Sequence, residues 1–366
     1  MVNDSNLFDL DYRNEARTMG PPVVPIIDAH AHVSGPHAAR ILLEAMDLYG
    51  ISEIWSMTSD IAQIDQLREI FAQRIRFIAV PNWRDPDAKH SHGTGYALRI
   101  REFYERGARI AKFWAAPRGI DIGTEAGEPK LMQLDNPVRV AAMHTAYELG
   151  MTFMVHVADP DTWFATKYSD HSKYGTKAMQ YEPLERMLDR FPTRWIAAHM
   201  GGWPEDLEFL SGLLNRHANL SLDTSATKWI VREISKHPRE DVVAFFHRFS
   251  GRLLFGSDIV TTDAHLQNTE TKFEMDAKAN NSHTAFDLYA SRYWALRTLW
   301  ETNAIRTSPI ADPDLAMVDP QTHTPKDAPV LKGVALSQDI LRGFYAGNAR
   351  ELMAQTLQRT AATNLI

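Results

Sequence analysis

Short apolar runs alternate along the chain with longer segments in which apolar residues recur at helical spacing. The short runs are rich in β-branched residues, as buried strands are, and they predict strands at residues 26–33, 51–57, 76–80, 108–115, 151–157, 194–199, 220–223 and 252–255. The longer segments predict helices at residues 37–49, 61–73, 96–106, 137–149, 183–190, 204–215 and 229–249. This alternation favours a parallel (β/α)8 barrel, with an open doubly wound sheet as the structural alternative.

The first predicted strand runs into the segment Asp28-Ala29-His30-Ala31-His32. Side chains two residues apart on a strand point to the same side, so His30 and His32 are expected to project together. Two imidazoles in this arrangement can bind one Zn²⁺, Mn²⁺ or Fe²⁺ ion. A pair of unrelated histidines at a strand end is the alternative, and further ligands elsewhere in the chain must decide between the two.

Three more polar residues stand where predicted strands end. His156 ends the fifth strand, His199 ends the sixth, and Asp258 follows the eighth. In a barrel, the carboxyl ends of the strands converge on one mouth, where barrel enzymes carry their active sites. Taken singly, each histidine fits a structural role and Asp258 fits a turn or a helix cap. Together with the histidine pair they form a set in barrel order, which predicts a site at the mouth.

Composition narrows the chemistry. The 366 residues are 44% hydrophobic and 23% charged, as in an ordinary globular enzyme, and the net charge of −7 provides no basic surface for nucleic acid. The absence of cysteine excludes disulfides, cysteine-ligated zinc and a cysteine nucleophile. The sequence has no apolar run of about 18 residues and no apolar signal region, so we expect a cytoplasmic protein without a membrane segment.

These motifs resemble the amidohydrolase superfamily of metal-dependent barrel enzymes. More narrowly, they are similar to the amidohydrolase-related group that includes aminocarboxymuconate-semialdehyde decarboxylase, lactonases and other hydrolases. The resemblance spans residues 26–352 and is carried by Asp28-Ala29-His30-Ala31-His32, Val155-His156, Ala198-His199-Met200-Gly201-Gly202, Phe255-Gly256-Ser257-Asp258 and Tyr345-Ala346-Gly347-Asn348-Ala349.

The resemblance implies a distorted TIM barrel that holds one divalent metal ion. The implied ligands are His30, His32, His156 and Asp258, with His199 as the acid/base residue beside the bound water. Three imidazoles and a carboxylate suit Zn²⁺ in first place, with Mn²⁺ or Fe²⁺ as alternatives. Zinc lowers the pKa of its bound water to about 7. His199 could then accept the water proton or polarise a substrate oxygen, and Asp258 could pass a proton to the leaving group.

Residues at the fourth strand are candidates for substrate binding. In binuclear members of the superfamily a lysine at the position of Lys112 is carboxylated and bridges two metals, but we favour an ordinary lysine that binds a substrate anion. Arg118 has the same candidate role, with a solvated loop arginine as the alternative. Trp114 is one of four tryptophans in or beside the predicted mouth loops, which either stack on a flat substrate or simply pack; the others are Trp83, Trp163 and Trp203.

We expect a single domain over residues 1–366, with the barrel at about 23–260, a helical and loop insert at about 261–335 and C-terminal helices at about 336–360. Residues 119–134 and 159–176 are expected to be loops. Within the insert, residues 268–300 are predicted to be mostly helical, and 303–333 an extended loop; no clear strand is expected in residues 260–332. The insert could cover the active site, form an oligomer contact or be a surface excursion.

The sequence therefore predicts a metal-dependent hydrolase in which activated water attacks a small-molecule ester, lactone or amide. The alternative is a carbon-carbon lyase that decarboxylates a small unsaturated or aromatic carboxylic acid, because the resembling family performs this reaction with the same residues. A catalytically silent metal-binding barrel is disfavoured because all five site residues are present. A structural metal site is normally closed by four protein ligands. The expected partner is a small molecule rather than nucleic acid or a membrane, and a homo-oligomer remains open.

Overall fold

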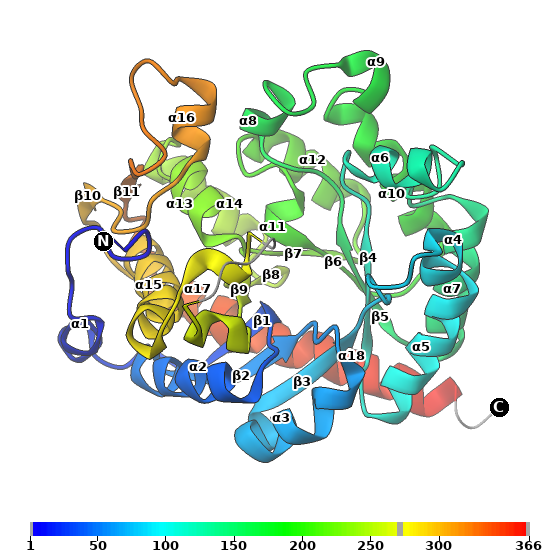
Figure 1. Cartoon of the computed structure of the whole chain (residues 1–366), viewed down its shortest axis with the longest axis horizontal. Helices are drawn as coiled ribbons and strands as arrows, with labels where there is room; N and C mark the ends of the chain where they lie inside the picture. The colour runs from blue at the N-terminus through cyan, green and yellow to red at the C-terminus, as the bar shows by residue number, and fades with distance from the viewer. Residues whose placement is uncertain (1–2, 269–273, 364–366) are drawn as a thin grey trace. The chain divides into compact units, whose positions relative to one another are not determined.

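The computed structural model describes residues 3–268 and 274–363, and its contacts divide the chain into two compact units. The first unit comprises Met1–Arg76 and Thr224–Asn348, and the second comprises Phe77–Asp223 and Ala349–Ile366. Each unit combines parallel strands with helices (Figure 1). The α/β class and the distorted (β/α)8 TIM barrel predicted from the sequence are confirmed.

The strands of the first unit centre on β1 (Ile26–His32), which pairs in parallel with β2 (Ile51–Ser56) and with β9 (Ile259–Val260). All residues of β1 from Ile26 to Ala31 are at most 3% exposed. The predicted eighth strand is shorter than expected, since β8 spans only Leu253–Leu254.

The prediction that residues 260–332 lack a strand is wrong. β9 ends at Val260, and an antiparallel pair, β10 (Ile305–Thr307) and β11 (Val330–Lys332), lies in the segment predicted to be an extended loop. Strands of two or three residues are too short to show an alternating pattern of apolar and polar residues, and their position depends on the strand with which they pair. The hydrophobic pattern therefore could not reveal them.

The second unit holds five strands that pair in parallel in chain order. They are β3 (Ile75–Ala79), which begins at the unit boundary, β4 (Ile110–Trp114), β5 (Thr152–His156), β6 (Trp195–Ala197) and β7 (Leu220–Asp223). Each starts within two residues of its predicted position. β6 ends two residues early because His199 and Met200 have φ angles of 57° and 49°, which no strand allows.

The helices of the first unit are α1 (Tyr12–Met19), α2 (Pro36–Tyr49), α3 (Ile64–Phe71), α13 (Thr227–Ile234), α14 (Arg239–Arg248), α15 (Ser282–Glu301), α16 (Asp314–Val318) and α17 (Gln338–Arg342). Short 3₁₀ turns η1 (Ile61–Gln63), η2 (Ala72–Arg74), η4 (Asp263–Leu266) and η5 (Asp276–Lys278) and the π-helical turn η6 (Gly343–Gly347) complete this set. The helix predicted at 229–249 is two helices, because Pro238 cannot continue the first. α2 and α15 pack side by side (Figure 1).

The helices of the second unit are α4 (Ala88–His92), α5 (Thr94–Glu105), α6 (Gly119–Glu125), α7 (Pro137–Glu148), α8 (Asp161–Phe164), α9 (His171–Tyr174), the 3₁₀ turn η3 (Ala178–Gln180), α10 (Tyr181–Arg190), α11 (Ala198–Gly201), α12 (Leu207–Arg216) and α18 (Asn348–Thr363), which begins at the unit boundary. The loops predicted at 119–134 and 159–176 contain α6, α8 and α9. These helices have only four to seven residues, too few to show a helical repeat.

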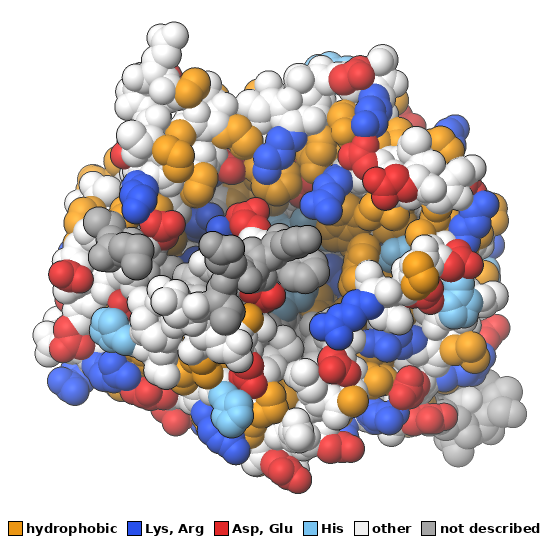
Figure 2. Space-filling model, in the orientation of Figure 1, with side chains coloured by type: hydrophobic (Ala, Val, Ile, Leu, Met, Phe, Trp, Pro, Cys, Tyr) orange, Lys and Arg blue, Asp and Glu red, His pale blue; other side chains and the backbone are white. Residues whose placement is uncertain are grey.

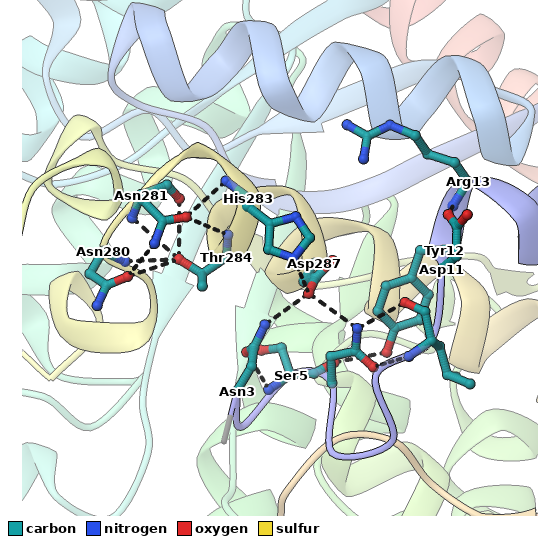
Figure 3. A network of polar contacts seen from close by, with 12 residues as sticks. Asn3, Ser5, Asp11, Tyr12, Arg13, Asn280, Asn281, His283, Thr284 and Asp287 are labelled. Carbon is teal, nitrogen blue, oxygen red and sulfur yellow. Dashed lines mark hydrogen bonds and ion pairs between the residues drawn. The ribbon is translucent and has the colours of Figure 1, made fainter. Parts of the chain in front are cut away.

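The first unit's α15 anchors the polar N-terminal segment (Figure 3). The helix starts with a capping box, in which the Asn281 side chain accepts from the backbone and Thr284 reciprocates. One turn later, the Asp287 carboxylate accepts hydrogen bonds from Asn3 at 2.9 Å and Asn6 at 3.1 Å. α15 confirms the later part of the helix predicted at 268–300, and residues 269–273 of that prediction lie outside the described residues.

The surface carries charges of both signs. On the face drawn in Figure 2, acidic and basic side chains are interspersed. Within residues 3–268 and 274–363, each helix is too short or too polar to cross a lipid bilayer.

Candidate metal and catalytic site

β1 carries two histidines that project in the same direction. His30 and His32 lie two residues apart at the end of this strand, and their ring centroids are 5.7 Å apart. The side chain of His30 is 1% exposed, whereas that of His32 is 39% exposed. One imidazole is therefore held in a buried position, and the other is open to solvent.

Asp258 lies between β8 and β9 and faces both histidines. Its Oδ1 is 3.4 Å from Nε2 of His30 and 3.3 Å from Nε2 of His32, and its backbone N–H donates to the His30 carbonyl. Its φ of 59° is unusual for a non-glycine residue and costs about 1–3 kcal/mol, a strain that tends to be found at functional sites. Two imidazole nitrogens and a carboxylate oxygen fit a divalent transition metal.

Gly256 and Ser225 explain how His30 is oriented. A Cβ on Gly256 would lie 3.0 Å from Cβ of His30 and 3.1 Å from Cβ of Ser225, so a larger residue here would push against both side chains. The Ser225 hydroxyl lies 3.1 Å from Nδ1 of His30. Since Nδ1 is engaged there, Nε2 is the nitrogen that faces Asp258.

A buried carboxylate, Asp28, ties three segments of the first unit together. It is 0% exposed and accepts from the Ser257 hydroxyl at 2.5 Å, the Ser257 backbone at 3.0 Å and the Tyr293 hydroxyl of α15 at 3.0 Å. Burial raises the pKa of Asp28 to about 6, although these hydrogen bonds oppose the rise. Asp28 thereby fixes the residue next to Asp258. Ser225 and Tyr293 could not be predicted from the sequence, because they are distant from the Asp28–His32 motif and carry no local signal.

In the second unit, His156 and His199 are in direct contact. Nδ1 of His156, at the end of β5, lies 3.1 Å from Nε2 of His199, and the two ring centroids are 4.7 Å apart. The backbone N–H of His199 donates to Oδ1 of Asp223, at the end of β7, over 2.9 Å. This bond helps to hold His199 in its left-handed conformation, in the turn after β6. Like Asp258, His199 is a predicted site residue with backbone strain.

A buried aspartate that was not predicted from the sequence, Asp159, contacts His156. Oδ1 of Asp159 lies 2.9 Å from Nε2 of His156, and Oδ2 accepts a hydrogen bond of 2.7 Å from the Tyr168 hydroxyl. Asp159 and Tyr168 are 5% and 3% exposed. Burial, reinforced by the Asp159 charge, holds the pKa of Tyr168 well above its usual range. The sequence could have indicated this contact, because Asp159 follows His156 by only three residues.

The register of β4 and β5 places Lys112 and Trp114 on the same face of the sheet as His156. Trp114 is paired with His156, and Lys112 lies two residues before Trp114. Lys112 is 6% exposed. The Trp114 ring lies 5.9 Å from the His156 ring and 5.7 Å from the ring of Trp83, which is 46% exposed. A row of aromatic rings therefore leads from the surface of this unit to His156.

The remaining candidates have other surroundings. Arg118 is exposed at the start of α6 and acts on the Tyr168 hydroxyl by its charge, lowering the pKa of that group against the larger effect of burial. The Trp163 ring carries the Lys167 ammonium 3.3 Å from its centroid. Trp203 stacks on Tyr181 at 5.6 Å, as expected of a packing residue.

Comparison with known sequences places this arrangement in a family. A sequence model described as amidohydrolase matches residues 27–353, which is most of the chain. The chain belongs to the amidohydrolase family. The match includes every residue predicted for the metal and catalytic site of this amidohydrolase. A search of curated proteins gave no significant match.

Several solved structures are similar to this amidohydrolase at low identity. One is an amidohydrolase II, with 11% identity, a TM-score of 0.48 and coverage of 90% of this chain and 99% of that chain. Another is 5-carboxyvanillate decarboxylase from Novosphingobium aromaticivorans in complex with manganese and a nitrobenzoic acid, with 11% identity, a TM-score of 0.46 and coverage of 90% and 96%. A third is an amidohydrolase from Burkholderia multivorans with bound zinc, with 13% identity, a TM-score of 0.42 and coverage of 90% and 99%.

Proposed function

We propose that this amidohydrolase is a metal-dependent hydrolase that uses activated water to attack a small-molecule ester, lactone or amide. The proposed ligands of one divalent ion are His30, His32, His156 and Asp258, with Zn²⁺ in first place and Mn²⁺ or Fe²⁺ as alternatives. The observation that carries the proposal is the approach of both β1 imidazoles to one Asp258 oxygen. When bound, such an ion supplies Lewis acidity and lowers the pKa of a water at the site toward neutrality.

The chain's own residues would move the protons. His199, which is 4% exposed, is proposed to take the proton from the attacking water. Asp258 is proposed to deliver a proton to the leaving oxygen or nitrogen. Ser225 would keep His30 oriented, and Asp28 would keep the backbone beside Asp258 in place.

Decarboxylation is the second candidate, and Lys112 is the observation that favours it. A buried lysine on the same sheet face as Trp114 suits a carboxylate carried on a flat group. A carboxylate-bearing ester or lactone would use the same contacts. We therefore propose Lys112, Arg118 and Trp114 as substrate-binding residues in either reaction.

Metal analysis tests the proposed site. Purified protein loaded with Zn²⁺ and desalted is expected to retain about one ion per chain, because the proposed ligands form a single set. Asp258→Ala should lose most of that ion, while His247→Gln, a change at an exposed histidine of α14, should retain it. Failure of the unaltered protein to retain metal would contradict the proposal. If the protein instead retains two ions per chain and Lys112→Ala loses one of them, the site is a binuclear one bridged by a carboxylated Lys112.

Turnover in ¹⁸O-labelled water then separates the two reactions. A panel of lactones, esters, amides and aromatic carboxylates provides the substrate. Hydrolysis places the label in a product carboxylate, because one oxygen of the product comes from water. Release of CO₂ with solvent deuterium on carbon in D₂O, and without a new carboxylate, would show decarboxylation instead.

A further inference from the structure

Both ring nitrogens of His156 are engaged in the second unit. Nε2 faces Oδ1 of the buried Asp159 at 2.9 Å, and Nδ1 faces Nε2 of His199 at 3.1 Å. A neutral imidazole donates from one nitrogen and accepts at the other, so these two contacts cannot be assigned independently. If one of the two neighbours of His156 can only accept a hydrogen bond, that neighbour determines the direction of both hydrogen bonds.

Asp159 is that neighbour. An ionised carboxylate accepts hydrogen bonds and cannot donate them. Its other oxygen, Oδ2, already accepts from the Tyr168 hydroxyl at 2.7 Å. Nε2 of His156 must therefore donate to Asp159, which leaves the lone pair of His156 on Nδ1. The 3.1 Å contact then requires that Nε2 of His199 carries the hydrogen.

The backbone around this chain of hydrogen bonds is closely packed. Gly202, three residues after His199, has a φ of 83°, and a Cβ there would lie 3.0 Å from the Ala158 carbonyl oxygen and 3.1 Å from the Ala158 nitrogen. The turn that carries His199 therefore lies directly against the residue before Asp159. Such contact limits the freedom of both segments to shift apart.

We propose that Asp159, anchored by Tyr168, is a positioning residue that holds His156 as its Nε2–H tautomer. The lone pair of His156 then lies on Nδ1, where it accepts from His199 in this structure and where a divalent metal would replace that hydrogen bond. A carboxylate behind a ligating histidine fixes its tautomer and ring orientation in this way. The same order of protons places a hydrogen on Nε2 of His199 in the metal-free protein and leaves the lone pair of a neutral His199 on Nδ1. The ligand part rests on the proposed metal site, whereas the tautomer part rests on the hydrogen bonds alone.

The tautomer can be measured without metal. In metal-free protein with ¹⁵N-labelled histidine, long-range ¹H–¹⁵N spectra at neutral pH are expected to show His156 as the Nε2–H form, with assignment by loss of the signals in His156→Gln. Asp159→Asn should lose this preference, because an amide can donate as well as accept. Tyr174→Phe is the matched control, since it removes a neighbouring hydroxyl that binds Asp121 and leaves Asp159 untouched. An Nδ1–H form in the unaltered protein would overturn the proposal.

Metal affinity supplies the second measurement. Titration with Zn²⁺ is expected to show affinity about 10–100-fold weaker in Asp159→Asn, a smaller loss in Tyr168→Phe and no change in Tyr174→Phe. Equal affinity of Asp159→Asn and the unaltered protein would overturn the positioning role. If the unaltered protein binds no Zn²⁺, the proposed metal site fails, and the NMR result still decides whether Asp159 sets the tautomer.

Discussion

At the scale of single residues, the two acid/base candidates share an unusual backbone. His199 and Asp258 both have φ angles near 60°, in a region that L-residues rarely adopt. In each case the surrounding hydrogen bonds hold the conformation: Asp223 accepts from the His199 backbone, and the His30 carbonyl accepts from that of Asp258. The strain thus marks two residues that the sequence had already singled out.

His199→Asn tests the catalytic role with little structural disturbance, because asparagine tolerates the left-handed conformation. We expect metal content close to that of the unaltered protein and a reduction of turnover by about 10²-fold or more, as for the loss of a general acid/base. His247→Asn, at an exposed position of α14, should leave both unchanged. Loss of the metal in His199→Asn would show that His199 is a ligand and that its assigned role is wrong.

At the scale of elements, the turn after β6 is the segment that positions His199. β6 has only three residues, and the segment from His199 to Gly202 then turns tightly against Ala158. Glycine at 202 combines two requirements, a positive φ and space for the neighbouring backbone. The position of His199 relative to His156 depends on this turn.

Comparison of Gly202→Ala with Gly127→Ala should separate the cost of a positive φ from the cost of contact with the neighbouring backbone. Gly127 has a φ of 72° with nothing within 4 Å of an added Cβ, so its substitution introduces strain alone, about 1–2 kcal/mol. Gly202→Ala adds the clash with Ala158, and we expect it to lower the free energy of unfolding by about 1–3 kcal/mol more. Urea unfolding measures both. Equal losses in the two variants would mean that the turn has room to move.

At the scale of the whole molecule, stability should depend on pH through a buried histidine, His92, whose ring contacts Trp83 at 4.8 Å. Burial, with a smaller contribution from the Arg139 charge, lowers the pKa of His92 from 6.5 to about 3. His92 is therefore protonated below about pH 6.5 in the unfolded chain, but only below about pH 3 in the folded chain. Stability is full above pH 6.5 and is lost as the pH falls through this window.

His92→Gln should remove this dependence. Each pH unit within the window is worth about 1.4 kcal/mol, so between pH 6.5 and 5 the unaltered protein should lose about 2 kcal/mol more than the variant. His90→Gln, an exposed change on the same helix, is the control and should keep the dependence of the unaltered protein. Parallel stability curves for the unaltered protein and His92→Gln would contradict the burial of a neutral His92.

The sequence by itself determined the class of the fold and the candidate residues. Strand and helix periodicities are local, so β1 to β7 and the helices α2, α5, α7, α10 and α12 could be predicted to within a few residues. The start of α15 and the division between α13 and α14 were not predicted. His30 and His32 could be paired because a strand's alternation is also local. The motif around Asp258 could be recognised for the same reason, since its residues are adjacent in the chain.

Only the tertiary structure determined which residues form hydrogen bonds with the candidate site residues. Ser225 beside His30 and Tyr293 on Asp28 come from segments about 200 residues away or more, and no local pattern marks such partners. Asp159 is near in sequence, but its role depends on Tyr168 and on the burial of both. The short strands β9 to β11 exist only through pairing. Hydrogen-bond partners and burial are set by the fold, and the chain order alone does not contain them.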